Sequence, residues 1–407
     1  AALYNNITAN NNVAVGHNAL LSNTTGGDNT SVGKSALQNN TTGNENVSTG
    51  YNSLLANTTG GYNVAYGARA LYSNTTASNN VAVGYFALYS NTTGHSNAAL
   101  GSSALRTNTT GIHNTATGIN ALYGNTTGNY NVAAGYAALQ NNTTGANNVA
   151  SGYFALVNNT TAADNVATGY QALYTNTGRA NTAVGRSALY GNTTGQENVG
   201  LGPYSMYSNT TASNNTAVGY AALEDNTTGG SNTALGQRAL RDCTTGGDNV
   251  GLGRLALRDC TVGCGNTGIG FLDSTGTYTP VFGVTTHHNR IVMGHTSVTN
   301  AYVKVAWTVT SDERDKMNFA PVPYGLDFVN QLKPTAYQFK VDRDTEKPNG
   351  DVRYGFKAQE ILALEGDNPV IIDTEDADHL KYKGEHLVPV LVNAVQELST
   401  MVKELQA

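Results

Sequence analysis

The first two thirds of the chain repeat one pattern of apolar and polar positions. Aligned on its Asn-Thr-Thr-Gly segment, the 17-residue unit is Asn-Thr-Thr-Gly-x-x-Asn-Val-Ala-Val-Gly-Tyr-x-Ala-Leu-x-x. It runs from Asn6 to Asn266 in sixteen copies, with a single one-residue deletion after Asn176. Internal repetition this regular is typical of an architecture made by stacking, in which each repeat is stabilised by its neighbours.

The Asn-Val-Ala-Val-Gly segment is the predicted strand of each repeat. The residue after the Asn is Val, Thr or Ala in every copy, and the next is always Ala, Ser or Gly. This alternation of β-branched and small residues gives the two faces of one strand different environments. The small residues must line an interior with room for little more than a methyl group. The other face must meet a second buried surface, which a lone solvated coil does not offer.

The rest of the repeat contains signals for turns and for stacking. The Gly after each strand, as at Gly16, is expected to turn the chain with φ values that other residues avoid. The Ala-Leu pair, as at Ala19 and Leu20, is a second apolar contact, and Asn-Thr-Thr-Gly closes the coil as a turn. Asn12, Asn29 and their successors would stack in register as an amide ladder.

These features predict an all-β repeat shaft, a parallel β-solenoid or β-roll. Sixteen coils at about 4.8 Å each would give a shaft roughly 75 Å long. Because the strand has to be buried on both faces, we expect several chains around one axis, as a homotrimer. We expect the recurrent Tyr residues to stack on each other between coils, with stacking on sugars as the alternative.

Charge divides the chain into two parts. Only 18 charged residues lie in the first 272, against 32 in the last 135. A net charge of −6 gives no reason to expect binding to nucleic acid or to anionic membranes. The sequence contains no run of 18 apolar residues, so it predicts no membrane-spanning segment. Since residues 1–4 already match the end of a repeat, we expect the sequence to begin inside a longer protein, with an anchoring part before it.

Cysteine and histidine offer few signals for a functional site. Cys243 and Cys260 occupy equivalent repeat positions, where the other copies have Asn, and Cys264 lies close by. Stacked coils would allow a disulfide between the first two, but three cysteines do not make a disulfide framework, so we expect free thiols. The His287-His288 pair lacks a spaced third ligand. We therefore expect a packing role there, and neither a metal nor a cofactor.

The last third of the chain has a different pattern. Residues 273–310 contain two strand-like stretches, 290–294 and 302–309, and we assign them to a β-rich connector. The segments that follow are Ser-Asp-x-Arg-x-Lys at 311–316, Leu-Lys-Pro at 332–334 with Tyr337 and Phe339 after it, and Tyr-Gly-Phe-Lys-Ala-Gln-Glu at 354–360.

A helix predicted over 386–406 closes the chain. Its apolar residues recur at spacings of 4, 3, 4 and 3, and they are Leu391, Val395, Leu398, Val402 and Leu405. This is a heptad seam for self-association in a coiled coil. A seam buried inside a single domain would have the same pattern over so few turns.

In order and spacing these segments resemble the C-terminal intramolecular chaperone and auto-processing domain of phage tailspikes and tail fibres, typified by endosialidases. The resemblance covers residues 311–407 and the strand leading into them. It implies a small α+β domain that trimerises a fibre and then cuts itself off just before the motif serine. One departure is Lys357, where the family often has an aliphatic residue.

The resemblance also implies roles for individual residues. The scissile bond would be Thr310–Ser311, with Ser311 as nucleophile, Lys316 as its base, and Asp312 and Arg314 as supports of the motif. A serine hydroxyl needs a base, and a lysine can serve only if burial lowers its pKa. Five residues separate serine and lysine, so a turn or a lysine from a neighbouring chain is required. The alternative is a charged domain boundary without chemistry.

Together these expectations describe a homotrimeric phage tail fibre with a shaft (1–272), a connector (273–310) and a self-releasing chaperone domain (311–407). Self-cleavage, as a single-turnover serine peptidase, is the only chemistry we predict. Expected partners are the other copies of the chain, a host cell-surface receptor, expected to be a glycan, and other virion tail proteins through the preceding N-terminal part. The expected location is the virion tail, after assembly in the bacterial cytoplasm.

Two other functions compete with the fibre. A trimeric bacterial surface adhesin has similar repeats in its head. Such adhesins end in a membrane anchor, whereas we predict a coiled-coil helix at the end of this chain, which makes this alternative less favoured. A depolymerising tailspike needs paired carboxylates in a groove. The acids of the shaft are scattered, and examples are Asp164, Glu197, Glu224 and Asp225.

Overall fold

The computed structural model describes residues 1–272, 276–296, 298, 311–340, 346–375 and 380–406. The chain divides into two compact units, Ala1–His295 and Thr296–Ala407. Each unit is described by itself. Within the described residues, no helix has the length and apolar character needed to cross a membrane.

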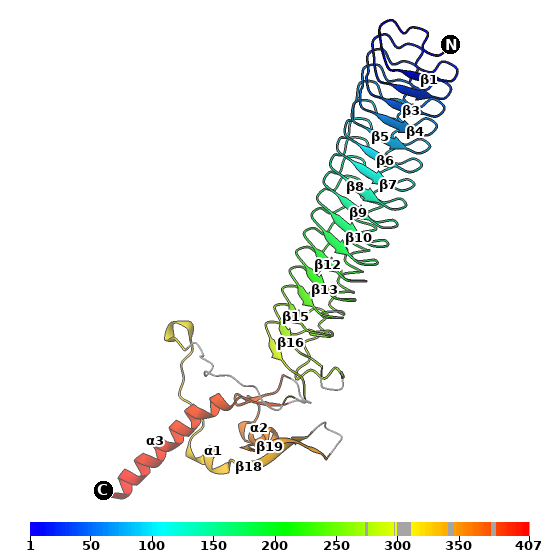
Figure 1. Cartoon of the computed structure of the whole chain (residues 1–407). Helices are drawn as coiled ribbons and strands as arrows, with labels where there is room; N and C mark the ends of the chain where they lie inside the picture. The colour runs from blue at the N-terminus through cyan, green and yellow to red at the C-terminus, as the bar shows by residue number, and fades with distance from the viewer. Residues whose placement is uncertain (273–275, 297, 299–310, 341–345, 376–379, 407) are drawn as a thin grey trace. The chain divides into compact units, whose positions relative to one another are not determined.

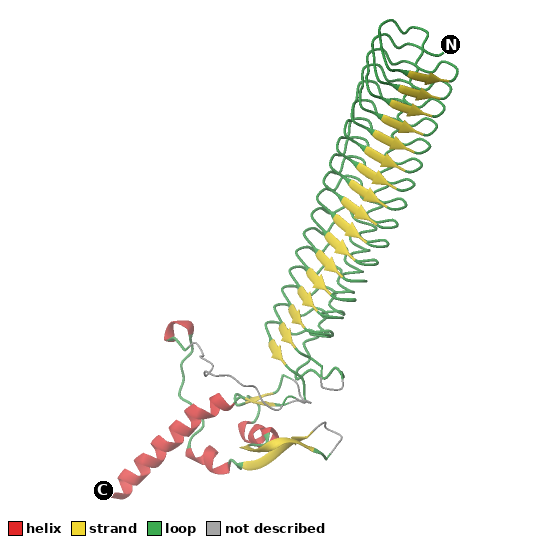
Figure 2. Ribbon diagram, viewed as in Figure 1, coloured by secondary structure: helices red, strands yellow, loops and turns green. Residues whose placement is uncertain are grey.

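The first unit is a parallel β-solenoid with one three-residue strand in each coil (Figures 1 and 2). Every strand pairs in parallel with the same strand of the next coil, so that Val13 lies opposite Thr30. The repeat strands are β1 (Val13–Val15), β2 (Thr30–Val32), β3 (Val47–Thr49), β4 (Val64–Tyr66), β5 (Val81–Val83), β6 (Ala98–Leu100), β7 (Thr115–Thr117), β8 (Val132–Ala134), β9 (Val149–Ser151), β10 (Val166–Thr168), β11 (Thr182–Val184), β12 (Val199–Leu201), β13 (Thr216–Val218), β14 (Thr233–Leu235), β15 (Val250–Leu252) and β16 (Thr267–Ile269). The predicted solenoid is confirmed.

The sheet continues beyond the last repeat. Strand β17 (Ile291–Met293) pairs in parallel with β16, with Thr267 opposite Ile291. The one-residue deletion after Asn176 does not interrupt the sheet, because Val166 of β10 still pairs with Thr182 of β11. The second strand predicted in the connector, 302–309, lies outside the described residues.

The interior of the solenoid is as narrow as the small residues require. The middle residue of each strand from β2 to β16 is buried, as at Ala65 and Ala82, and the Ala-Leu pair after the turn packs against it. The first and third strand residues face outward, and Val15 and Leu235 are 58% and 49% exposed. A parallel sheet is normally covered on both faces. The outer face of this sheet is therefore an apolar surface without a cover in the single chain.

The turn glycine has the predicted conformation. Gly16 has φ 129°, and a Cβ there would lie 2.6 Å from the Gly33 carbonyl oxygen of the next coil. Other residues share the positive-φ region, and the buried Leu20, at φ 52°, does so in every copy of its position. Such a residue costs about 1–2 kcal/mol. Hydrogen bonds between coils, such as Leu20 N–H to the Ala36 carbonyl at 3.1 Å, hold it in place.

Two asparagine ladders run through the solenoid. In the expected one, Asn46 Nδ2 donates to Asn29 Oδ1 at 3.1 Å. The second is formed by the Asn of the Asn-Thr-Thr turn, where Asn40 Nδ2 donates to Asn23 Oδ1 at 2.8 Å and to the carbonyl of its own turn. Sequence analysis assigned this Asn to the turn alone. Both rows are buried over most of their length, and most of their amide groups are paired, as burial of a polar group requires; the exceptions include Asn159 Oδ1 and Asn226 Oδ1.

The second unit is a small α+β domain with two small sheets and a C-terminal helix, as predicted. Its strands are β18 (Thr335–Lys340), β19 (Pro348–Gly355), β20 (Ile372–Asp373) and β21 (Lys381–Tyr382), and its helices are η1 (Glu313–Asp315), α1 (Leu326–Gln331), α2 (Ala358–Glu365), η2 (Gly384–His386) and α3 (Leu387–Gln406). Strand β18 pairs with β19 and β20 with β21, both antiparallel. Phe328, Ile361, Ile371, Leu387 and Val390 are among its core residues.

Candidate functional site

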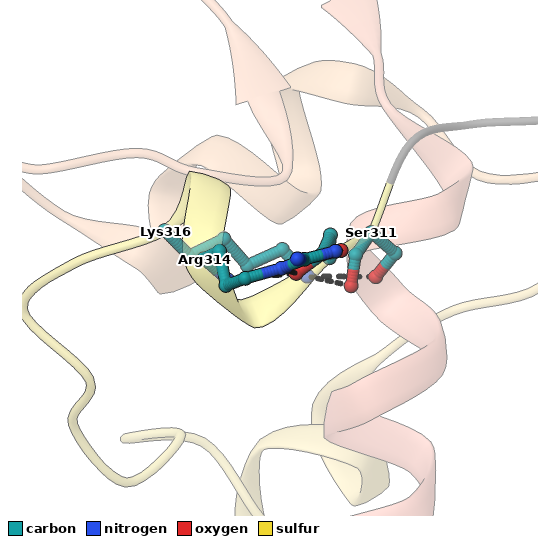
Figure 3. A network of polar contacts seen from close by, with 4 residues as sticks. Ser311, Arg314 and Lys316 are labelled. Atoms are coloured by element: carbon teal, nitrogen blue, oxygen red, sulfur yellow. Dashed lines mark hydrogen bonds and ion pairs between the residues drawn. The ribbon is translucent and has the colours of Figure 1, made fainter.

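The one-turn helix η1 brings the predicted nucleophile and base together. Lys316 Nζ donates to Ser311 Oγ at 2.7 Å and to the Ser311 carbonyl at 3.3 Å (Figure 3). The Asp312 side chain caps η1 by accepting from the Arg314 backbone N–H at 2.9 Å. Of the two arrangements that the five-residue spacing allowed, the structure has the turn within one chain. Thr310, on the other side of the predicted scissile bond, lies outside the described residues.

Asp312 and Arg314 form an ion pair beside the serine. Arg314 Nη2 and Nε donate to the Asp312 carboxylate at 2.6 Å and 3.0 Å. Hydrogen bonds from the Arg314 side chain lower the pKa of Asp312, and the same bonds raise the pKa of Arg314. The carboxylate is thereby engaged by an arginine, while the described hydrogen bonds of Lys316 Nζ go to Ser311.

Ser311 and Lys316 lie at one wall of a groove of about 970 Å³ in the second unit. Apolar side chains line most of it, among them Val322, Ile371 and Val390, and Glu385 and His386 also border it. Both Ser311 and Lys316 are exposed in the single chain. A lysine becomes a base when it is removed from water. The arrangement therefore has the geometry of a serine–lysine pair, but neither side chain is buried in the single chain.

A buried glutamate holds the groove wall in shape. The Glu365 carboxylate accepts from three consecutive backbone N–H groups, those of Val370 at 2.8 Å, Ile371 at 2.6 Å and Ile372 at 3.0 Å. Val370 and Ile371 are groove residues. The sequence gave no signal for this role beyond a glutamate at the end of a short helix, since the contact depends on the loop that follows.

Two polar side chains of helix α3 bind the backbone at the start of helix α1, and we call these contacts the polar clamp. Glu397 Oε2 accepts from the Leu326 N–H at 2.7 Å, which places a carboxylate at the N-terminus of α1. Asn393 Nδ2 donates to the Tyr324 carbonyl at 2.9 Å. A Cβ at Gly325 would collide with the Glu397 carboxylate, so a side chain at this position would have to displace Glu397. Sequence analysis did not identify this polar clamp, because it joins segments far apart in the chain.

The other candidate residues do not form a common site. Asp164 accepts a hydrogen bond from Asn147 at 3.1 Å, and Glu197 lies 3.9 Å from Arg179. Burial, and then a neighbouring carboxylate, raises the pKa of both Glu224 and Asp225. These acids are engaged in separate contacts along the shaft.

The remaining cysteine and histidine candidates also have local partners. Cys243, Cys260 and Cys264 are free thiols, as expected. His288 Nδ1 accepts from the Cys264 N–H at 3.0 Å, and the His287 ring packs edge-on against Phe282. Among the described residues, no group of three or more His, Cys, Asp or Glu side chains could hold a metal ion.

Comparison with known proteins identifies the second unit. Residues 311–368 match the family described as chaperone of endosialidase. The comparisons with curated proteins and with solved structures find no match. The matched segment begins at Ser311 and contains η1, α1, the β18–β19 hairpin and α2. This chain thus has a β-solenoid shaft and, C-terminal to it, a segment that matches the chaperone-of-endosialidase family, a combination that fits a phage tail fibre or tailspike.

Proposed function

We propose that this chain is the shaft and assembly domain of a phage tail fibre. Three copies associate through the C-terminal domain, which then releases itself by cleavage of the Thr310–Ser311 bond. The observation that carries the proposal is the 2.7 Å contact between Lys316 Nζ and Ser311 Oγ at the start of the chaperone-family match. The match also favours a fibre over a bacterial surface adhesin.

The chemistry follows from the position of the serine after the scissile bond. Neutral Lys316 takes the Ser311 hydroxyl proton, and Oγ attacks the Thr310 carbonyl carbon. The Thr310–Ser311 C–N bond breaks as the lysine returns the proton to the Ser311 nitrogen, which leaves an ester between Thr310 and Oγ. Water then hydrolyses the ester to a Thr310 carboxylate and a free Ser311 hydroxyl.

Assembly would supply the missing burial. Lys316 is exposed in one chain, where its ammonium is well solvated. A neighbouring copy that covered the serine–lysine pair would remove water and favour the neutral amine. Cleavage would then follow assembly, so that the clamp is lost only after the shaft has formed.

Two uncovered apolar surfaces support association of copies. One is the outer face of the solenoid strands, where none of the first and third residues of β1–β16 is charged. The other is the α3 seam, whose members are between 42% and 87% exposed, and they are Leu391, Val395, Leu398, Val402 and Leu405. Parallel packing of three such helices would bury the seam and set the level at which the chains start.

The test compares the full chain with Ser311→Ala and Lys316→Ala variants. We expect wild type to lose its last 97 residues on a denaturing gel, while both variants stay full-length. All three should have the native mass of a trimer. Lys340→Ala is the matched control, because Lys340 pairs with Glu346 on the hairpin and should not affect cleavage. If assembled wild type never shortens, the peptidase role fails and the assembly role remains.

The released shaft would attach the virion to a host cell-surface glycan. It would join other tail proteins through residues that precede the repeats. Adsorption of the purified trimeric shaft to host cells, and competition with intact phage, measures this part of the proposal.

A further inference from the structure

One edge of the solenoid carries cations and aromatic rings without carboxylates. This cationic edge consists of the two residues after each turn glycine, from 17–18 to 254–255. Its fifteen pairs include five cationic residues and no Asp or Glu, and the five are Lys34, Arg69, Arg186, Arg238 and Arg254. Residues 1–272 contain nine cationic and nine acidic residues, so the shaft is neutral but its charges are separated.

The cations of the edge are held against rings of adjacent coils. The Arg69 guanidinium lies 6.0 Å from the Tyr51 ring and 5.4 Å from the Phe86 ring. Arg186 has the same relation to Tyr170 and Tyr204, at 5.8 Å and 5.6 Å. A guanidinium group between two rings is restrained by cation–π attraction, and its N–H groups can still donate to acceptors.

These guanidinium groups differ from Arg179 and Arg258 of the shaft, although Arg106 also lies against rings. Among the described contacts, Arg69, Arg186 and Arg238 have neither an ion pair nor a hydrogen bond to an acceptor. Away from the edge, Arg179 lies 3.9 Å from Glu197 and Arg258 lies 2.6 Å from Asp259. Arg69 and Arg186 thus contact rings of the edge, while Arg238 also interacts electrostatically with Glu224, so the positive charge of the edge is compensated only in part.

Tyrosines extend the edge between its arginines. Tyr136, Tyr153 and Tyr170 stack with ring centroids 5.1 Å and 5.6 Å apart. They are 43%, 45% and 46% exposed, although each ring face is against a neighbour. Their ring edges and hydroxyl groups face solvent. Each of these three coils therefore presents one tyrosine hydroxyl that can donate or accept a hydrogen bond.

We propose that the cationic edge binds a carboxylate-bearing polysaccharide laid along the shaft. A long ligand with carboxylates and hydroxyls fits a surface on which cations recur at intervals and tyrosine hydroxyls lie between them. Arginine binds a carboxylate through paired N–H groups, and many weak exposed contacts add up when they are linked in one chain. This assignment rests on the proposed host-attachment function and names the ligand class for it.

A second copy of the chain fits the cationic edge poorly. In a parallel arrangement, contact between the edges of two copies would place like charges opposite each other, which is unfavourable. The outer strand face has no charge at β1–β16, so it suits the contact between copies, and the edge is left for a polar ligand.

The test is retention of the full chain in native gels that contain hyaluronan or polygalacturonate, with neutral dextran as the comparison. We expect the two acidic polymers to retard the chain and dextran to have no effect. Retardation should disappear at about 1 M salt, where the screening length falls to about 3 Å. No retardation by either acidic polymer, or equal retardation by dextran, would overturn the assignment.

Variants locate the binding surface. Arg69→Gln/Arg186→Gln/Arg238→Gln should weaken binding roughly tenfold or more, because linked contacts are lost together. The corresponding Arg→Lys triple variant should keep most of the binding, and its thermal stability controls for folding. Arg179→Gln, on a different side of the coil, should bind like wild type. A Gln variant that bound like wild type would contradict the proposal.

The same samples separate this inference from the proposed function. Native mass and chain length report trimer formation and cleavage, and neither depends on the cationic edge. Normal assembly and host-cell adsorption without polysaccharide binding would refute the edge alone. Loss of the trimer in wild type would refute the fibre.

Discussion

At the scale of single residues, the ladder formed by the turn asparagines has two unpaired acceptors, each next to a repeat that departs from the consensus sequence. Asn226 Oδ1 and Asn159 Oδ1 are buried without a hydrogen-bond partner. In the first case the next position of the ladder is Cys243, which has no amide to donate. In the second the next position is Asn176, whose Nδ2 is turned to the Gly178 carbonyl at the deletion. Each exception leaves one unpaired acceptor in an otherwise paired row.

Restoring the ladder should stabilise the shaft. In a Cys243→Asn variant, the new amide can donate to Asn226 Oδ1 and to the Gly246 carbonyl that the thiol now faces. The new Oδ1 would face Cys260, whose thiol is only a weak donor, but two new hydrogen bonds of about 1 kcal/mol each outweigh this, so we expect a higher thermal midpoint by differential scanning calorimetry. Cys264→Ser is the control, because Cys264 is not a ladder position. A lower midpoint for Cys243→Asn than for wild type would contradict this account.

Glu224 and Asp225, which lie between β13 and β14, should make the stability of the shaft depend on pH. Burial raises the pKa of Glu224 and Asp225. The folded state therefore binds protons more tightly than the unfolded state, and stability falls as pH rises through the acidic range toward neutrality. A Glu224→Gln/Asp225→Asn variant should unfold at a higher temperature than wild type at pH 7. The difference should shrink at pH 4, and a difference independent of pH would count against it.

At the scale of elements, α3 organises its domain through polar contacts as much as through its apolar face. Glu397 and Asn393 hold the start of α1, and Glu365 of α2 holds the loop that forms one groove wall. The serine–lysine pair borders the same groove. Loss of a polar contact far from Ser311 would therefore alter the surroundings of the pair.

A Gly325→Ala substitution should separate α1 from α3. The added methyl group would collide with the Glu397 carboxylate and displace it from the Leu326 N–H. We expect a loss of about 1–3 kcal/mol in the stability of the domain, the usual cost of an unsatisfied buried group. Chemical denaturation followed by circular dichroism of α3 measures this. In a Glu397→Ala background the same Gly325→Ala substitution should cost little more, and an equal loss in both backgrounds would argue against the clamp.

Predictability from the sequence varied with the range of the contact. The strands, the turn glycine and the Asn12 row follow from one repeat, because each coil meets a copy of itself. The positive φ of Leu20 could not be predicted, since leucine avoids that region unless surrounding contacts impose it. The resemblance to a known family pointed to Ser311 and Lys316, and the turn that joins them is local. Glu365, Asn393 and Glu397 were missed, because their partners are backbone groups that only the folded domain brings near.

At the scale of the whole molecule, in-register pairing makes neighbouring coils interchangeable. Ala98 lies opposite Thr115, and Thr115 lies opposite Val132, through equivalent contacts. A repeat of this kind specifies a stack but not a unique alignment between chains. The chaperone-family domain and the α3 seam are the parts of the chain that differ from the repeat and can supply the alignment.

Deletion of one whole repeat should leave the fold intact. Without residues 115–131, Asn114 would be followed by Val132, and Ala98 would lie opposite Val132. Such a variant should still form trimers and melt close to wild type. Removal of residues 115–123, about half of a coil, would put strand residues against a turn and should produce aggregated protein on size-exclusion chromatography. Equal behaviour of the two deletions would contradict interchangeable coils.

The parallel register also gives the fibre a unit of length. Because any coil can follow any other, gain or loss of 17 residues would move the two ends of the shaft by one strand spacing, about 4.8 Å. In the proposed fibre, duplication or loss of DNA encoding one repeat would change the distance between the virion and its receptor in fixed steps. Neither the interior packing nor the chaperone domain would have to change. The number of coils therefore determines the length of the shaft.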